Sequence, residues 1–330
     1  MLKSAARKLA LLACVALLIC SPQTIAYGET PKNEIADASG IKNVLLLGRD
    51  NSSGLADVII LVSVNIEEKA LTAIQIPRDT YVFLGEGSYK KINGAPSLLG
   101  GEAELCKTLG EAAGIDIDGY ISFDTRLIKD AVNALGGIEL FVPADMDYDD
   151  PYQGLSIHLK KGLQRLSGEE AVGFVRYRSG YVRADLGRMD AQKIFLAAAA
   201  RTAIEEISGA DIFPLAKLTL KYVKTNLTLS SLTSLASSVK KATTENISFV
   251  TLPGEEIQSS KSGAWFYILS KSGCEKIFSK IGSKSEFDKK HLFSDAFRSE
   301  FEEIYNREIE TRIYNAAEID GEGIDIATKN

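Results

Sequence analysis

The chain has 330 residues, of which 45% are hydrophobic, with a net charge of −6 at pH 7 and a pI near 5.3. This length allows a substantial core in one large domain or two small ones, and the acidic balance argues against nucleic acid as the main partner. The sequence lacks a GxSxG elbow, a P-loop and a GxGxxG run, which excludes the common serine-hydrolase, NTPase and dinucleotide-binding motifs.

The first residues have the pattern of an export leader. Lys3, Arg7 and Lys8 precede an apolar run over 9–20, the order of a positive n-region and an h-region. The run is short for a membrane span, which needs about 20 apolar residues. We predict that residues 1–28 are either a cleaved signal peptide or an N-terminal membrane anchor, that 29–42 are a linker, and that the remainder is exported.

Three apolar segments in the first third of the chain, at 43–48, 58–64 and 71–76, predict neighbouring strands. The short connection between the second and third indicates a hairpin, so part of the sheet should be antiparallel. Charged residues stand where these strands begin or end, and they are Arg49, Asp50, Asp57, Arg78 and Asp79.

Loops at strand ends carry the chemistry in many sheet proteins. Magnesium is typically held by one or two carboxylates together with phosphate oxygens and water. The strand-end carboxylates and arginines therefore indicate a site for a metal-bound phosphate ester.

Alternating elements follow. Helices are predicted at 100–113 and 125–135, and strands at 120–123 and 138–142. Gly136-Gly137 fits a helix C-cap that leads straight into a strand. Such alternation favours an α/β fold with three layers, α-β-α, around a central mixed sheet.

The segment 146–154 (MDYDDPYQG) is acidic and rich in turn residues. Its aspartates lack the ligand order of an EF-hand, so we expect a solvated loop rather than a calcium site. A lid over an acceptor is another option.

A cluster of cationic side chains precedes and opens a helix predicted at 184–204. Arg176 and Arg178 come just before it, and Arg188 and Gln192 lie in its first turns. A helix N-terminus favours anions, and guanidinium groups add forked donors for phosphate. From this segment alone, a solvated, salt-bridged face is the alternative.

Several strings together resemble the LytR-CpsA-Psr (LCP) family of cell-envelope phosphotransferases. They are NVLLLGRD, DVIILVSVN, IPRDTYV, KINGA, LGGIEL, KKGLQRLSGEEAVGFVRYR and DLGRMDAQKIFL. The resemblance covers 43–204, with a weaker extension over 205–281, and we assign 43–281 to an LCP catalytic domain.

The resemblance implies transfer of an anionic glycopolymer, such as teichoic acid or capsule, from an undecaprenyl-pyrophosphate carrier to peptidoglycan at the outer face of the membrane. It implies a Mg²⁺ site (Mn²⁺ possible) at Asp50 and Asp57. Arg78, Arg176, Arg178 and Arg188 would hold the pyrophosphate with help from Gln192.

The resemblance also implies an apolar tunnel for the prenyl tail, with Phe195, Leu196 and Val132 as wall residues. Asp79 would orient Arg78 or accept the proton of the sugar hydroxyl. We favour orientation, because a carboxylate beside an arginine is a poor base.

The chain departs from the family pattern at Leu55 and Ala191, where a basic residue is usual. Arg49 and Arg183 are candidate substitutes, with Arg49 a candidate substrate-binding residue. These departures keep two alternatives open: a polyprenyl-pyrophosphate hydrolase, and a non-catalytic carrier or wall-binding module for the lipid-linked glycan.

The last third is less regular. We predict two helices within 213–241, strands at 247–252 and 265–269, and a charged tail over 282–330 with one amphipathic helix followed by disorder. Cys106 and Cys274 are expected to be free and buried.

Overall fold

The computed structural model of the protein describes most of the chain after residue 39. The described residues are 40–49, 54–84, 90–152, 154–205, 218, 221–239, 242–294 and 298–329. The predicted leader over 1–28 and nearly all of the predicted linker lie outside them. Among the described residues, no helix is both long enough and apolar enough to cross a membrane.

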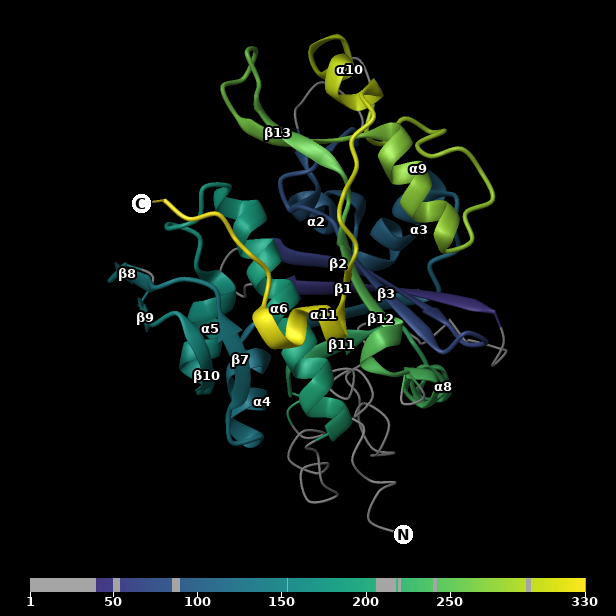
Figure 1. Ribbon diagram of the computed structural model, residues 1–330. Helices are drawn as coiled ribbons and strands as arrows, with labels where there is room; N and C mark the ends of the chain where they lie inside the picture. The colour runs from purple at the N-terminus through teal and green to yellow at the C-terminus, as the bar shows by residue number, and fades with distance from the viewer. Residues whose placement is uncertain are drawn as a thin grey trace.

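A seven-stranded sheet forms the centre of the molecule (Figure 1). In spatial order its strands are β11 (Val223–Thr225), β6 (Gly119–Asp124), β1 (Ile41–Arg49), β2 (Ala56–Asn65), β3 (Ala70–Gln75), β12 (Ile247–Thr251) and β15 (Tyr314–Asn315). Strands β1, β2 and β3 form an antiparallel meander. Strand β6 pairs parallel to β1, and β12 pairs parallel to β3. The predicted mixed sheet is confirmed.

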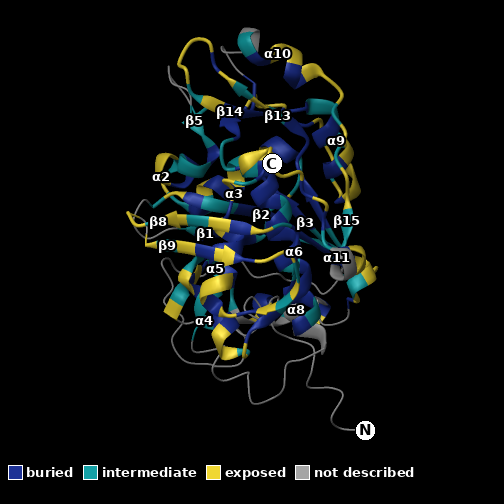
Figure 2. Cartoon of the chain, turned by 60° about the vertical axis from the view of Figure 1, so that its left-hand side comes forward, coloured by how far each residue is buried: buried dark blue, intermediate teal, exposed yellow. Residues whose placement is uncertain are grey.

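Each face of the sheet is covered by its own hydrophobic core. On strand β1, Val44 belongs to one core, while Leu45 and Leu47 belong to the other. A strand buried on both faces is therefore apolar at successive positions instead of alternating. Figure 2 shows the buried residues concentrated around the central strands and the exposed ones on the outer helices and hairpins.

The first core lies between the sheet and α4 (Arg126–Ala134), α5 (Gly168–Arg176), α6 (Ala184–Glu205) and α8 (Leu229–Val239). The second lies under α3 (Glu102–Ala113), α9 (Lys271–Lys280) and α10 (Arg298–Asn306). The two helical layers confirm the three-layer α-β-α fold.

Small elements complete the fold. They are β4 (Tyr81–Val82), β5 (Lys90–Lys91), η2 (Ile92–Gly94), α2 (Ala95–Leu99), β7 (Ile138–Val142), β8 (Met146–Asp150), β9 (Leu155–Leu159), β10 (Gly162–Leu166), η3 (Thr244–Asn246), β13 (Gly254–Gln258), β14 (Trp265–Leu269) and α11 (Ala316–Glu322). The acidic segment predicted as a loop is largely the β8–β9 hairpin.

Local signals in the sequence account for several helix ends. Helix α5 starts with a capping box in which Ser167 and Glu170 bond each other's backbone N–H groups. Helix α4 ends at Gly136 and Gly137, whose φ angles are +74° and +104°, conformations that favour glycine. Cys106 and Cys274 are free and buried, as expected, and burial raises the pKa of the Cys106 thiol to about 12.

The amphipathic helix predicted in the tail is present as α10, but the disorder predicted after it is wrong. Residues after 281 contribute Phe287, Phe293 and Phe301 to the second core. Strand β15 then extends the main sheet by pairing with β12, and α11 packs on α6. This segment is rich in charged residues, and its apolar residues are widely spaced, so the sequence pattern did not indicate that they would be buried.

The two helices predicted within 213–241 are also only partly right. Residues 223–225 form strand β11, and only α8 is a helix of more than one turn among the residues described there.

Candidate functional site

A cavity of about 560 Å³ lies on the first-core side of the sheet. Its apolar walls come from the sheet, from α4, α5 and α6, and from the β8–β9 hairpin. The apolar lining residues are Leu46, Val58, Ile60, Ile121, Phe123, Leu127, Ile128, Ala131, Tyr148, Leu155, Val172, Val175, Phe195, Leu196 and Val223. Among its polar lining residues are Asp57, Arg78, Arg176, Arg178, Arg188 and Gln192. We call the four arginines in this set the arginine cluster. The cavity thus joins a long apolar surface to a strongly cationic one.

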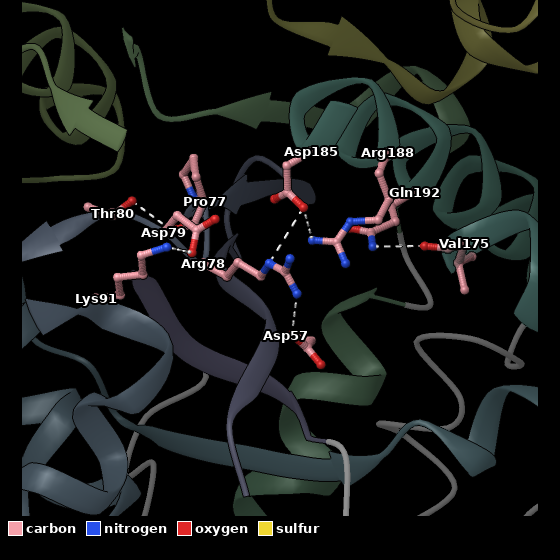
Figure 3. A network of polar contacts seen from close by, with 10 residues as sticks. All are labelled: Asp57, Pro77, Arg78, Asp79, Thr80, Lys91, Val175, Asp185, Arg188 and Gln192. Carbon is pink, nitrogen blue, oxygen red and sulfur yellow. Dashed lines mark hydrogen bonds and ion pairs between the residues drawn. The ribbon is translucent and has the colours of Figure 1, made fainter. Parts of the chain in front are cut away.

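Three elements bring the charged groups together (Figure 3). Arg78 follows β3 in a turn closed by Thr80, whose N–H and hydroxyl both donate to the Pro77 carbonyl. Nη1 of Arg78 donates to Oδ1 of Asp57, at the start of β2, over 2.7 Å. Because β2 and β3 are antiparallel, the start of β2 and the end of β3 lie side by side at the same end of the sheet.

Asp185, in the first turn of α6, bridges two members of the arginine cluster. Its Oδ1 lies 2.8 Å from Nη2 of Arg188 and 3.5 Å from Nε of Arg78. A single carboxylate oxygen therefore faces two guanidinium groups, with Arg188 only 7% exposed. The carboxylate holds the two arginines in position, and several N–H groups of each guanidinium do not bond to it.

Unused donors remain at this point. The Nε atoms of Arg78 and Arg188 are buried and make no hydrogen bond within the described part of the chain, although Nε of Arg78 has the long ion pair with Asp185. Buried donors are nearly always satisfied in folded proteins, so an exception calls for a missing ligand or a functional role. An oxyanion is the acceptor that guanidinium groups fit best.

Electrostatics distinguish the two arginines. Burial lowers the pKa of Arg188, an effect that Asp185 only partly offsets. Burial also acts to lower the pKa of Arg78, but Asp185 and Asp57 outweigh it, so the pKa is raised. The positive charge of Arg188 is thus less compensated than that of Arg78, and an anion in the cavity would stabilise it.

The remaining predicted cavity residues occupy their expected places. Arg176 and Arg178 are exposed side chains on the cavity wall. Nε2 of Gln192 donates to the Val175 carbonyl at 3.2 Å and so joins α6 to α5. Phe195 and Leu196 line the cavity one turn further along α6. Their roles stay predictions.

Three predicted residues are not on the cavity, and a fourth, Asp50, lies outside the described residues. Asp79 pairs with Lys91, its Oδ1 2.8 Å from Nζ, on the far side of the turn from the Asp57 contact of Arg78 (Figure 3). Val132 is 1% exposed in the first core and is absent from the lining. The turn after β3 sends adjacent side chains in opposite directions, so Asp57 and Asp185, and not Asp79, orient Arg78.

Arg49 is the third residue off the cavity and is not a substitute cation for it. It contacts Glu102 at 2.6 Å through Nη1 and donates to the Gly54 carbonyl through Nε and Nη2. It therefore anchors both sides of the β1–β2 connection to α3. The departures from the family pattern also lie off the wall, since Ala191 is fully buried and Leu55 is outside the lining.

Glu102 gives a test of this anchor. Burial acts to raise its pKa, but a backbone N–H, Lys224 and Arg49 outweigh that effect and hold the pKa below its usual range. A depressed folded-state pKa adds stability above the unfolded-state value, and that stability is lost as pH falls through the folded-state value. We expect Glu102→Gln to lower the free energy of unfolding by about 1.5–3 kcal/mol at pH 7.

Urea unfolding of the two proteins between pH 7 and pH 3 measures this difference, which should shrink towards the acid end. Glu104→Gln, an exposed carboxylate in the same first turn of α3, is the control and should change little. A difference that does not depend on pH would contradict the assigned charge pair.

Asp185 belongs to the stretch of charged residues that opens the helix at 184–204, but no role in the site was predicted for it. The available signal was its spacing of three from Arg188, since residues three apart on a helix are neighbours. Its contact with Arg78, across more than 100 positions of sequence, had no signal in the sequence.

Asp57 fits a role in holding a divalent cation. It lines the cavity, and its side chain is 31% exposed although one oxygen pairs with Arg78. Magnesium commonly takes one or two carboxylates and completes its shell with phosphate and water. Within the described residues there is no group of three or more histidine, cysteine or acidic side chains that could hold a metal on its own.

The comparisons with known proteins agree with this geometry. The model of the LytR_cpsA_psr family matches residues 22–282, so the chain belongs to the LytR-CpsA-Psr family.

Among individual relatives, the polyisoprenyl-teichoic acid–peptidoglycan teichoic acid transferase TagV of Bacillus subtilis (strain 168) is 30% identical over 256 residues, covering 74% of this chain and 65% of TagV. The chain thus spans just under two thirds of that relative's length. TagU of Bacillus cereus, which bears the same transferase name, is 29% identical over 251 residues, covering 75% of this chain and 80% of TagU.

Solved structures share the fold. The crystal structure of B. subtilis TagV matches with a TM-score of 0.62 and 28% identity, covering 74% of this chain and 96% of that one. TagT bound to LIIa-WTA matches with a TM-score of 0.60 and 25% identity, covering 78% and 97%.

Proposed function

We propose that this protein transfers an anionic glycopolymer of the teichoic-acid kind from a polyisoprenyl-pyrophosphate carrier to peptidoglycan, forming a phosphodiester outside the cytoplasmic membrane. The observation that carries the proposal is one cavity that combines apolar walls with the arginine cluster. A prenyl pyrophosphate has the same two parts, a long apolar chain and a compact anion. The names of TagV and TagU support the assignment.

The reaction is a phosphoryl transfer. The acceptor hydroxyl attacks the phosphorus that carries the glycan, a new P–O bond forms, and the bond from that phosphorus to the bridging oxygen breaks. The bridging oxygen leaves with the prenyl monophosphate, and the hydroxyl proton passes to solvent or to a leaving phosphate oxygen. Such transfers need positioning and charge stabilisation more than covalent help from the protein.

The arginine cluster supplies both needs. Arg188 and Arg78 line the cavity with guanidinium donors for the phosphate oxygens, and donors fixed in place before the reaction stabilise the charge that develops on the leaving group. Phe195 and Leu196, on the same helix as Arg188, would hold the first isoprene units. Binding of the tail therefore fixes where the pyrophosphate lies.

A bound magnesium ion would neutralise charge on the pyrophosphate oxygens, and we assign Asp57 together with Asp50 to hold it. We expect EDTA to abolish transfer and Mg²⁺ or Mn²⁺ to restore it. Asp57→Asn should raise the Mg²⁺ concentration for half-maximal rate by roughly 10–100-fold or more. Asp116→Asn, outside the cavity lining, is the control. Full activity in EDTA would exclude the metal requirement.

The function itself is tested with the chain from residue 40 onward, a short-chain prenyl-pyrophosphate glycan, peptidoglycan fragments and Mg²⁺. A phosphodiester-linked glycan–peptidoglycan product, detected by mass spectrometry, is the expected result. Prenyl monophosphate released without acceptor would instead favour a hydrolase. Tight lipid binding without any product, across several glycans and acceptors, would favour a carrier.

The proposed substrate places the protein at the outer face of the membrane. The predicted leader over residues 1–28 would deliver the chain there, either as a retained anchor or as a cleaved signal peptide.

A further inference from the structure

We infer that residues 323–329 form a strap that positions the loop carrying Arg176 and Arg178 over the cavity. The strap is defined by those residues, and the arginine loop by residues 176–183, of which Arg176 is also the last residue of α5. The inference rests on the proposed function, to which it adds a positioning element. The family match ends at residue 282, so no part of the strap contributed to the family assignment.

The strap pairs with the arginine loop through its backbone. The Val182 N–H donates to the Ala327 carbonyl at 2.9 Å, and the Lys329 N–H donates to the Gly180 carbonyl at 2.8 Å. These bonds flank an antiparallel bridge between Tyr181 and Thr328. Nζ of Lys329 also donates to the Ser179 carbonyl at 3.0 Å. The loop is thus held along its outer edge as a strand is held in a sheet.

The strap is itself fixed to the first core. Ile324 and Ile326 are buried there, while Asp325 and Ala327 between and after them are exposed. Gly323, with a φ of +70°, turns the chain out of α11 beside Phe141 and Ile194. Figure 1 shows this last segment running from α11 across α6. Its position is therefore set by packing and does not depend on the loop.

The inner side of the arginine loop is held by aromatic packing. Tyr181 is fully buried, and its ring meets that of Tyr177 edge-to-face at 5.3 Å. It also lies against Gly187 of α6, where a Cβ atom would come within 2.6 Å of the Tyr181 Cβ. The loop is clamped between this packing and the strap.

The clamp matters because of where Arg178 and Ser179 stand. Both line the cavity, and Ser179 is one of the residues that the strap contacts. Arg176 and Arg178 have exposed side chains, so their own burial does not fix their direction. Connecting loops are ordinarily the less ordered parts of a fold. The strap touches the loop and not the cavity, which makes its residues positioning residues.

Two variants loosen the strap in different ways. Ile326→Ser removes a core anchor, and Lys329→Pro removes the N–H that bonds Gly180 without disturbing the core. Asp325→Ala, exposed in the same segment, is the matched control. Hydrogen–deuterium exchange of the Val182 amide should accelerate by roughly tenfold or more in both variants and stay unchanged in the control.

Binding of farnesyl pyrophosphate with Mg²⁺, measured by calorimetry, gives the second readout. We expect Kd to rise roughly fivefold or more in the strap variants. In an Arg176→Ala/Arg178→Ala background the same strap change should add nothing, because the groups that it positions are gone.

An equal loss of binding with and without the two arginines would overturn the inference, as would unchanged binding despite faster Val182 exchange. Neither readout needs transfer to occur. If the double-mutant coupling holds but no glycan is ever transferred, the strap stands and the proposed function fails.

Discussion

Replacing Arg78 with alanine is expected to lower kcat/KM for glycan transfer by on the order of 10²–10³-fold, as when one preorganised donor to a developing oxyanion is removed. Arg78 forms ion pairs with both Asp57 and Asp185. Its loss removes a pyrophosphate donor and also removes the cation shared by Asp185 and by Asp57, which lines the cavity. Both effects oppose binding of an anion.

Arg78→Lys separates these effects. Lysine keeps the charge but not the fork that lets one side chain reach both carboxylates, so we expect a smaller loss than with alanine. Transfer rates with the short-chain substrate measure both variants. Arg307→Ala is the control, because Arg307 also pairs with two carboxylates, Glu255 and Glu303, but lies outside the cavity. Equal activity of Arg78→Ala and Arg307→Ala would remove Arg78 from the site.

Asp185→Ala should cause the largest loss of stability in the protein without a bound anion. Asp185 is the counter-ion that Arg78 and Arg188 share, and these three side chains are 13%, 21% and 9% exposed. Removing one partner of a buried charge group commonly costs about 3–5 kcal/mol because the remaining charge is uncompensated. We expect a loss of this size in the free energy of unfolding.

Pyrophosphate should reverse part of that loss, since an anion in the cavity can replace the missing carboxylate. Asp190→Ala is a matched control: Asp190 lies on the same helix, three residues before its partner Lys193, whose side chain is 3% exposed. Both variants should melt lower than the native protein, but only Asp185→Ala should gain more from added pyrophosphate than the native protein does. Equal gains in the two variants would show that Asp185 does not face the anion.

The sequence was most informative where apolar periodicity and charged strand ends coincided. The β1–β3 meander, its hairpin and the helix after the arginines are found within two or three residues of their predicted bounds. Arg78, Arg176, Arg178, Arg188 and Gln192 do gather on one cavity. Here local pattern and tertiary structure agree.

Other features depended on contacts that no local pattern encodes. Arg49 pairs with Glu102 and Asp79 pairs with Lys91, and no pattern in the sequence indicates that these partners lie nearby. Strand β15 is short, and its pairing with β12 joins segments more than 60 residues apart. Charge-rich composition predicted disorder at the end of the tail, whereas phenylalanines and isoleucines set at intervals hold the segment in the two cores.

The order of strands in the sheet has a consequence for how the site is assembled during folding. Strands β1, β2 and β3 are neighbours in sequence, and contacts between near neighbours tend to form early. Asp57 and Arg78 belong to this meander, but Asp185 and Arg188 arrive with α6, which Gln75 ties down by donating to the Met189 carbonyl at 3.1 Å.

A chain folded only as far as the meander therefore holds half of the charge network. It also presents two open edges, at β1 and β3, until the distant strands β6 and β12 cover them. The capacity to bind a pyrophosphate lipid should thus appear late, together with protection of the sheet edges, and not before the second half of the chain has joined the first.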